Sequence, residues 1–419
     1  LTWPLANNYF EKPLTMNKRI NKLNKNEFIA LMAMLMSVTA LSIDAMIPAL
    51  GKMSVDLMIS EANSIQLVIS SVFLGMAFGV LIYGPFADSY GRKKAIYLGI
   101  FIFLIGTLIS IFATNLFVML LGRTIQGFGS AACRVVTMAI IRDKYEGTEM
   151  AKIMSLIMMV FIMVPALAPL LGQGILIFAS WQTIFWFIFV FALISTTWMH
   201  FRQRETLSPE KVRSFSFTVI FSGILETIKN RISMGYTLAS GIMFGAFVSY
   251  LSSAQQIMEI QYELGQMFPL IFGFLAIVYG FASFLNSKLL NKFSMHQICL
   301  ASLVLQVSLS SIFLIISLAN NNDITFTLFF IYMILNFFCL GPLFGNFNSM
   351  ALQPFGHMAG LATSVISSIQ TLSAVIVGII IGQAYDGTVK PIILGYMLCG
   401  MGTLIIFLLT KRRISTHSS

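Results

Sequence analysis

Twelve long apolar runs divide this chain, and each is long enough to cross a lipid bilayer. A helix needs roughly 20 apolar residues to span the hydrocarbon core, where it satisfies its own backbone hydrogen bonds. The runs are continuous and do not alternate with a period of two, so they favour helices over strands. The expected spans cover residues 28–50, 64–86, 95–113, 116–141, 152–177, 182–201, 233–254, 268–287, 297–319, 324–345, 359–382 and 391–410.

Composition indicates the same class of protein. Hydrophobic residues make up 57% of the chain, charged residues 10%, and the mean hydropathy is +0.86. Such a chain cannot cover itself with a water-facing surface. We therefore predict an all-α integral membrane protein with twelve transmembrane helices.

The positions of lysine and arginine predict the orientation. With the N-terminus in the cytoplasm, cytoplasmic segments hold 22 of the 26 lysines and arginines, as the positive-inside rule requires. Lys52 and Lys390 would lie outside, and Arg123 and Arg134 fall within the fourth span. The net charge of +10 then reflects topology and contact with anionic lipids, and a nucleic-acid partner is not expected.

The longest polar stretch divides the chain into two halves. We expect a basic cytoplasmic tail over 1–27, a six-helix bundle over 28–201, a cytoplasmic linker over 202–232, a second bundle over 233–410 and a cytoplasmic tail over 411–419. Polar residues near Ser222 and Glu226 leave open a separate interfacial helix before the seventh span. The first tail has no apolar core typical of a signal peptide, so the first span is expected to direct insertion. Transporters commonly place a midplane site between two such halves.

Several functional classes are not supported. The four cysteines, Cys133, Cys299, Cys339 and Cys399, fall inside spans without paired spacing, so neither a disulfide nor a metal site is predicted. No phosphate-binding loop occurs, and the four histidines form no hydrolase motif. We therefore do not expect an enzyme.

The polar turn between the second and third spans is the most distinctive motif. The run GPFADSYGRKK carries Gly84, Asp88, Gly91, Arg92 and Lys93. Its glycines permit a tight turn, and the aspartate can pair with the arginine or cap a neighbouring helix end.

The first and fourth spans carry charged residues within the expected hydrocarbon region. Asp44, in SIDAMIPAL, is the one acidic residue placed well inside a span, and Arg123 stands in LGRTIQGFGSAA. At about 1.5 Å rise per residue, the two share a similar depth, so an ion pair, direct or through water, is possible. Such a carboxylate can exchange protons between two solvents, although a structural ion pair that never titrates stays an alternative.

These motifs resemble the major facilitator superfamily, and more narrowly its drug:proton antiporters of the bicyclomycin-resistance type. The loop fits the family's G-x-x-x-D-x-x-G-R-K signature, which implies a latch between the halves on the cytoplasmic side. In the fourth span the resemblance covers Arg123, Gln126 and Gly127, and in the first it covers Asp44 and Pro48 as D-x-x-x-P.

The fifth span resembles the family's antiporter motif, whose core is G-P-x-x-G-G. Within VPALAPLLGQG, the matching positions are Pro169 and Gly172, and Pro165 with Pro169 retains the bend of the helix. Ala168 and Gln173 replace two glycines, which weakens the case for export.

Other polar residues in the spans are candidates for a substrate cavity. Arg134 lies about three turns from Arg123 on one helix, where it would snorkel, bind a lipid phosphate or line the cavity. The second half offers Gln306, Asn336 and Gln370.

The resemblance implies a twelve-helix secondary transporter of the bacterial inner membrane, with both termini cytoplasmic. It would export small amphipathic compounds in exchange for protons, with Asp44 as proton carrier, Arg123 as its charge partner and the Gly84–Lys93 loop as cytoplasmic gate. The proton gradient would supply the energy, without a cofactor or metal, and the protein would act as a monomer. The alternatives are a proton-coupled importer on the same fold and a sensor or lipid-handling protein without net transport.

Overall fold

The structure is a computed structural model that describes residues 23–212 and 216–417. Within those residues, helices are the only regular secondary structure, and twelve of the helical segments are long and apolar enough to cross a membrane. Each of the expected spans overlaps one of these segments, and the largest difference lies at the end of the tenth, which was expected to end at 345 and continues to Gly356. The predicted all-α fold with twelve transmembrane helices is confirmed.

The helices fall into two groups along the chain. The first group comprises α1 Lys25–Asp44, α2 Leu50–Asp56, α3 Leu67–Tyr90, α4 Arg92–Ile111, α5 Leu116–Lys144, α6 Gly147–Phe178 and α7 Gln182–Arg202. The second comprises α8 Phe217–Lys229, α9 Arg231–Gln255, α10 Phe268–Leu289, α11 Met295–Ala319, α12 Phe326–Leu352, α13 Ala359–Gln383 and α14 Lys390–His417. Short helical turns are η1 Ile47–Ala49, η2 Ala62–Gln66, η3 Pro209–Lys211, the π-helical η4 Gln256–Gln261, η5 Gly265–Met267 and η6 Gln353–Met358.

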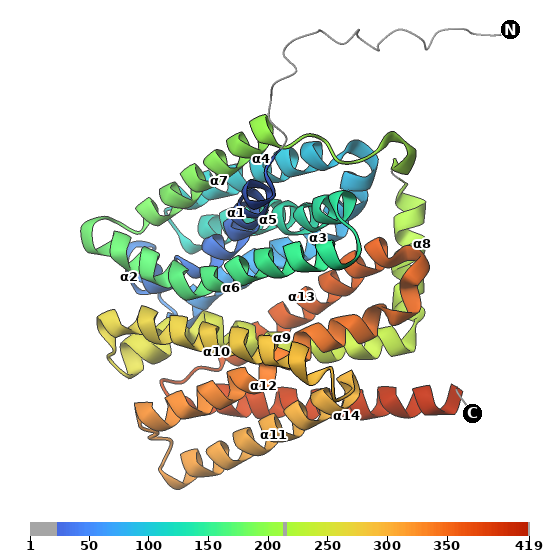
Figure 1. Ribbon diagram of the computed structural model, residues 1–419. Coiled ribbons are helices and arrows are strands. Elements are labelled where there is room, and N and C mark those ends of the chain that lie inside the picture. The colour runs from blue at the N-terminus through green and yellow to red at the C-terminus, as the bar shows by residue number, and fades with distance from the viewer. Residues whose placement is uncertain (1–22, 213–215, 418–419) are drawn as a thin grey trace, which may run out of the picture.

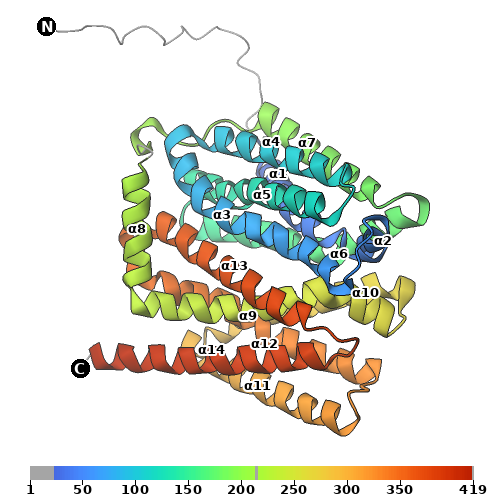
Figure 2. The same cartoon turned by 180° about the vertical axis from the view of Figure 1, so that it is seen from behind.

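The two groups form two bundles that lie side by side (Figure 1), in blue to green above and yellow to red below. Two helix pairs join them, α3 with α13 and α6 with α10. Both pairs are also visible from behind (Figure 2). Any cavity between the bundles is therefore walled by these four helices and by the helices next to them.

The linker contains a helix of its own. α8 lies across the ends of the spans (Figure 1) and is separated from α9 by Asn230, whose side chain accepts a hydrogen bond from the backbone N–H of Ser233 at 3.0 Å. The separate helix before the seventh span, left open by the sequence, is thus present.

The ends of the chain differ in part from the expected tails. α14 continues to His417, so the segment predicted as a tail from 411 begins as an extension of the last helix. Residues 1–22 of the predicted N-terminal tail lie outside the described part of the chain.

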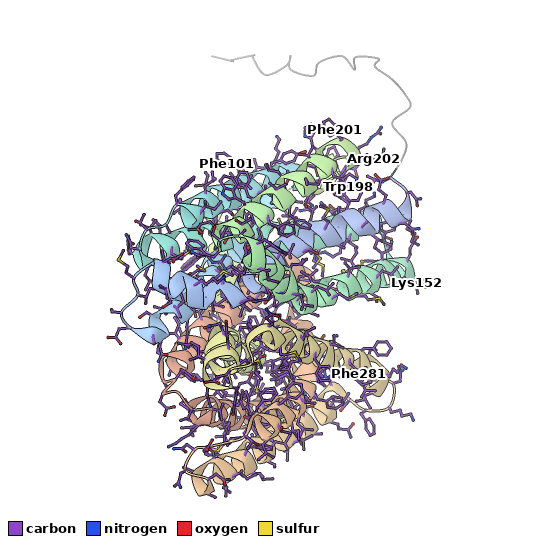
Figure 3. The ribbon with its side chains drawn as sticks, turned by 90° about the vertical axis from the view of Figure 1, so that its left-hand side faces the viewer. Phe101, Lys152, Trp198, Phe201, Arg202 and Phe281 are labelled. Atoms are coloured by element: carbon purple, nitrogen blue, oxygen red, sulfur yellow. The ribbon has the colours of Figure 1, made fainter. Side chains whose placement is uncertain are left out.

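Large apolar side chains cover the outside of both bundles. Phe101 of α4 and Phe281 of α10 lie on the exterior (Figure 3) and are 62% and 58% exposed. Lipid contact accounts for this exposure, because apolar patches of this extent are rare on soluble monomers.

Candidate functional site

The first span is interrupted at Asp44. α1 ends at this residue, and the turn η1 leads from it into α2. Pro48 explains the break, because a proline ring clashes with the carbonyl group four positions earlier and has no N–H to donate. The D-x-x-x-P spacing therefore places a carboxylate at a helix end inside a membrane span, where backbone carbonyls lack helical partners.

Arg123 of α5 binds the helix end beside Asp44. The arginine is fully buried, and its Nη2 donates to the carbonyl oxygen of Ser42 at 2.7 Å while its Nε donates to that of Val68 at 3.3 Å. A cation is stabilised at a helix C-terminus by the helix dipole and by the free carbonyl groups. Arg123 thus ties α1 and α3 to α5 at the break.

Neighbouring residues of the fourth span hold Arg123 in place. Its Nη1 donates to the side chain of Gln126, whose Nε2 donates to Thr107 Oγ1 at 2.8 Å. The guanidinium also lies 5.5 Å from the ring centroid of Phe185 on α7. Gly127, the third residue of this motif, packs against the backbone of α3, where a side chain would collide with the carbonyl of Val72.

The structure does not pair Arg123 with Asp44. Among the described residues, no hydrogen bond or ion pair reaches the Asp44 carboxylate, although the residue is only 5% exposed. A direct ion pair, one of the two possibilities left open by the sequence, is absent in this conformation among the described residues, because two carbonyl groups and Gln126 occupy the guanidinium. Asp44 is left facing a cavity.

The antiporter-like segment of α6 packs on the same break. A Cβ atom at Gly172 would collide with the carbonyl oxygen of Ala45, so this glycine permits α6 to touch the backbone directly after Asp44. Pro165 lines the cavity that Asp44 faces, and Pro169 is buried one turn further along α6.

Two adjoining cavities lie between the bundles. The central cavity, of about 280 Å³, is lined by Asp44, Arg134, Pro165 and Gln370 together with residues of α9, α10 and α12. The loop-face cavity, of about 450 Å³, is lined by Gly84, Asp88 and Arg92 and by α8. Five residues line both cavities: Met76, Arg134, Asn348, Ser367 and Thr371. We call the end of the molecule with the Gly84–Lys93 loop the loop face, and the end with η2 the opposite face.

An ion-pair network organises the loop motif. The Arg92 Nε donates to Asp143 Oδ2 at 2.9 Å, and its Nη1 binds Asp88. Thr206, in the linker, donates its hydroxyl to the same Asp143 oxygen at 3.0 Å. Gly84 approaches the other bundle, where a Cβ atom on it would lie 2.6 Å from Ser364 Oγ on α13.

Glu205 caps the helix that follows the loop. Gly91 has a φ of +104°, a value that suits glycine, and turns the chain so that the backbone N–H groups of Arg92 and Lys93 each donate to the Glu205 carboxylate at 3.0 Å. Partial burial alone would raise the pKa of Glu205, but these two donors, with the N–H groups of Leu207 and Thr206, hold the pKa below its usual value. The Lys93 ammonium donates to the carbonyl of His200 at 3.1 Å.

Uncharged hydrogen bonds join the bundles on the opposite face. Gln256 of η4 donates from Nε2 to the carbonyl of Ala62 at 2.9 Å and accepts from the Gln66 side chain. Asn63 Nδ2 donates to the carbonyl of Tyr385 at 2.8 Å, and Gln383 Nε2 donates to the carbonyl of Asn63 at 2.8 Å. We call these residues the amide latch. They close the opposite face, while the loop-face cavity extends the central cavity toward the other end.

Comparison with known proteins agrees with this architecture. The model of the Major Facilitator Superfamily matches residues 32–378. The chain belongs to this superfamily.

Its relatives within the superfamily include proteins named for drug resistance. The bicyclomycin resistance protein homolog of Haemophilus influenzae is 28% identical over 93% of this chain and 98% of its own. The multidrug resistance protein MdtL of Klebsiella pneumoniae is 30% identical over 78% of this chain and 81% of its own. An uncharacterized transporter of the same superfamily, YdgK of Bacillus subtilis, is 28% identical over 93% of this chain and 96% of its own.

Solved structures share the fold. The nucleoside transporter NupG matches with a TM-score of 0.71 at 13% identity, over 91% of this chain and 99% of its own. The xylose transporter XylE of Escherichia coli matches with a TM-score of 0.67 at 13% identity, over 92% of this chain and 97% of its own. At such identities the likeness concerns the fold alone.

Of the three polar residues of the second half that were predicted for the cavity, one lines the central cavity. Gln370 lines the central cavity and donates from Nε2 to Asn348 Oδ1 at 3.1 Å. Gln306 and Asn336, however, are fully buried within the C-terminal bundle, where Gln306 Nε2 donates to Asn336 Oδ1 at 3.2 Å. They were wrong as cavity candidates, because their helix faces point into their own bundle.

Three residues of the site escaped the sequence analysis. Asp143 stands between Arg142 and Lys144, and Glu205 directly follows Arg204, so their basic neighbours could have singled them out. No sequence signal indicated that Gln256 would bridge the bundles, because its partners lie 190 or more positions away.

Proposed function

We propose that this chain exports small amphipathic compounds in exchange for protons. The observation that carries the proposal is the placement of Asp44, a carboxylate without an ionic partner in the described residues, on the wall of a cavity between two bundles. A carboxylate whose solvent exposure changes as the bundles rock gains and loses a proton with that change. It then couples proton entry to the movement of a second solute.

The names of the relatives support export as the direction. Two relatives that align over most of this chain are named for resistance to bicyclomycin and to multiple drugs. Resistance fits a transporter that removes compounds from the cell. The altered residues Ala168 and Gln173 in the antiporter motif make import on the same fold the second candidate.

The orientation follows from the charge distribution. The loop face carries Arg92, Lys93 and the basic linker, so we assign it to the cytoplasm of a bacterial cell. Both termini then lie in the cytoplasm, and the amide latch closes the outer side of the inner membrane. We further propose that the protein acts as a monomer, driven by the proton gradient without a bound cofactor or metal.

The experiment uses inverted membrane vesicles whose lumen has been acidified. Lipophilic anions, cations and neutral compounds are added in turn, and a fluorescent pH indicator reports proton release from the lumen. We expect substrate-evoked alkalinisation with the natural chain, its loss in Asp44→Asn, and its retention in Asp323→Asn. The second variant removes an exposed carboxylate from a loop of the opposite face.

Each other outcome changes the proposal. An unchanged response in Asp44→Asn, at equal protein level, would remove Asp44 from coupling. If no compound evokes a response in any of the three proteins, export in exchange for protons is refuted, and uptake of the same compounds into right-side-out vesicles would then support import.

A further inference from the structure

The accessible charge of the central cavity is positive. Arg134 of α5 is exposed and lines both cavities at their junction. Asp44 lines the same central cavity but is only 5% exposed. A solute that fills the cavity therefore meets a cation more readily than a carboxylate.

Arg134 differs from the other arginines of the site because it has no ion-pair or hydrogen-bond partner among the described residues. Arg123 is fully buried and bound by three acceptors, and Arg92 is 7% exposed and bound by Asp88 and Asp143. For Arg134, the described residues provide neither an ion pair nor a side-chain hydrogen bond, although its five N–H groups are strong donors. Arginine within a membrane span is costly and marks a functional position unless it is paired.

The walls around Arg134 suit the apolar body of a ligand. Rings dominate the lining of the central cavity: Phe73, Phe161, Phe244, Phe247, Tyr250, Phe272, Tyr279, Phe337 and Phe344. The Tyr250 hydroxyl is buried without a hydrogen-bond partner in the part of the chain that the structure describes. The cavity thus combines an aromatic lining, a free cation and one unused hydroxyl group, as ligand sites with few polar groups do.

We propose that the substrates of this transporter are acidic amphiphiles, whose carboxylate or sulfonate group binds Arg134 while their apolar body fills the aromatic part of the central cavity. The inference rests on the proposed transport function and names its substrate class. A carboxylate can accept two parallel hydrogen bonds from one guanidinium, and its charge makes these bonds roughly twice as strong as those to a neutral acceptor. Arg134 then acts as a specificity-determining residue.

The test compares three probes that share one fluorophore. Dansylglycine carries a negative charge, dansylamide is neutral and dansylcadaverine is positively charged. Their dissociation constants are measured by fluorescence with the full chain in nanodiscs of zwitterionic lipid, and empty nanodiscs give the background. We expect the natural chain to bind dansylglycine about tenfold or more tightly than dansylamide, as charge-assisted hydrogen bonds allow.

Variants on one helix separate the role of Arg134 from general electrostatics. Arg134→Gln is expected to abolish the preference for the anion, and Arg134→Lys to restore most of it. Arg142→Gln removes the same charge from α5 but outside the central cavity, and it should leave the preference intact. Size-exclusion elution and thermal unfolding show whether each variant is folded.

Three results would overturn the inference: dansylglycine fails to bind the natural chain, dansylcadaverine binds most tightly, or the anion preference survives in Arg134→Gln. These binding constants do not depend on flux. If the anion preference is retained but no proton release occurs in vesicles, antiport is refuted and the ligand class stands. If proton release occurs but the anion preference is absent, the ligand class is refuted and antiport stands.

Discussion

Gly172 of α6 lies against the backbone carbonyl oxygen of Ala45, the residue that follows Asp44. Arg123 holds the same helix end from the other side, through the carbonyl of Ser42 at 2.7 Å. The break at Asp44 is therefore fixed by two neighbouring helices, while Asp44 itself lines the central cavity. This arrangement gives a rigid backbone to a group that is proposed to change its protonation.

Replacing Gly172 by alanine should disturb the break. The added Cβ would meet backbone atoms of Ala45, which cannot turn aside as a flexible side chain can, so we expect a destabilisation of about 1–3 kcal/mol and a loss of proton release. Thermal unfolding of the purified protein and the vesicle assay measure the two effects. Gly174→Ala is the matched control, because nothing lies within 4 Å of a Cβ atom at that position. Equal behaviour of the two variants would contradict the role of close packing.

Weakening the amide latch should open the opposite face. Gln256→Ala removes the donor to the carbonyl of Ala62 and the acceptor for Gln66. Because a hydrogen bond is worth about 1 kcal/mol, the population of the outward-open conformation should rise several-fold. Ser240 lines the central cavity, and Ser240→Cys reports the change through labelling by a membrane-impermeant maleimide from outside the cell.

The background of that measurement is low, because all four native cysteines are buried. Asn320→Ala serves as control, since the Asn320 side chain bonds only within its own helix end, to the carbonyl of Ile316 at 2.9 Å. Labelling that stays the same in Gln256→Ala would show that the latch does not limit opening.

Sequence patterns were sufficient to predict the membrane spans and to single out the charged residues at the break in the first span. Hydrophobic length defines a transmembrane helix because lipid provides no hydrogen bonds for the backbone, and a proline four residues after Asp44 locates the helix end. The same patterns could not decide which polar side chains face the cavity. Gln306 and Gln370 are both glutamines within spans, and only the rotation of each helix against its neighbours places the first in a bundle core and the second on the cavity wall.

Removing Arg92 should destabilise the loop motif. Its side chain is 8% exposed and bridges Asp88 and Asp143, so Arg92→Gln leaves a half-buried pair of carboxylates without their cation and should cost about 1–3 kcal/mol. Arg92 also donates from Nη2 to Asp143 Oδ1 at 3.4 Å, beside the Nε bond. Arg92→Lys keeps the charge but cannot reproduce this pair of bonds, and an intermediate loss is expected. Thermal unfolding measures both, with Lys94→Gln as control. If Arg92→Gln melts at the same temperature as the natural chain, the ion pairs of Arg92 with Asp88 and Asp143 add no stability.

The cap formed by Glu205 should make stability depend on pH. Burial alone would raise the pKa of this carboxyl, but the N–H groups of Leu207, Lys93, Arg92 and Thr206 together hold it below its usual value. The unfolded chain therefore binds a proton more readily than the folded one. The stabilisation is then complete above the unfolded pKa of about 4.3 and is lost as the pH falls through the lower, folded value. Glu205→Gln should therefore melt earlier than the natural chain near pH 6, and the difference should shrink steadily as the pH falls below about 4.3.

Many carboxyl groups contribute to the pH dependence of stability, so the quantity to follow is the difference in melting temperature between Glu205→Gln and the natural chain. Glu210→Gln removes a second, exposed carboxylate from the linker, and its melting curve should shift with pH in parallel with that of the natural chain. A constant gap between Glu205→Gln and the natural chain from pH 6 to pH 3 would mean that the carboxyl group contributes through its shape and hydrogen bonding alone. A gap that closes at low pH would show that its charge stabilises the start of α4, as expected for an anion at a helix N-terminus.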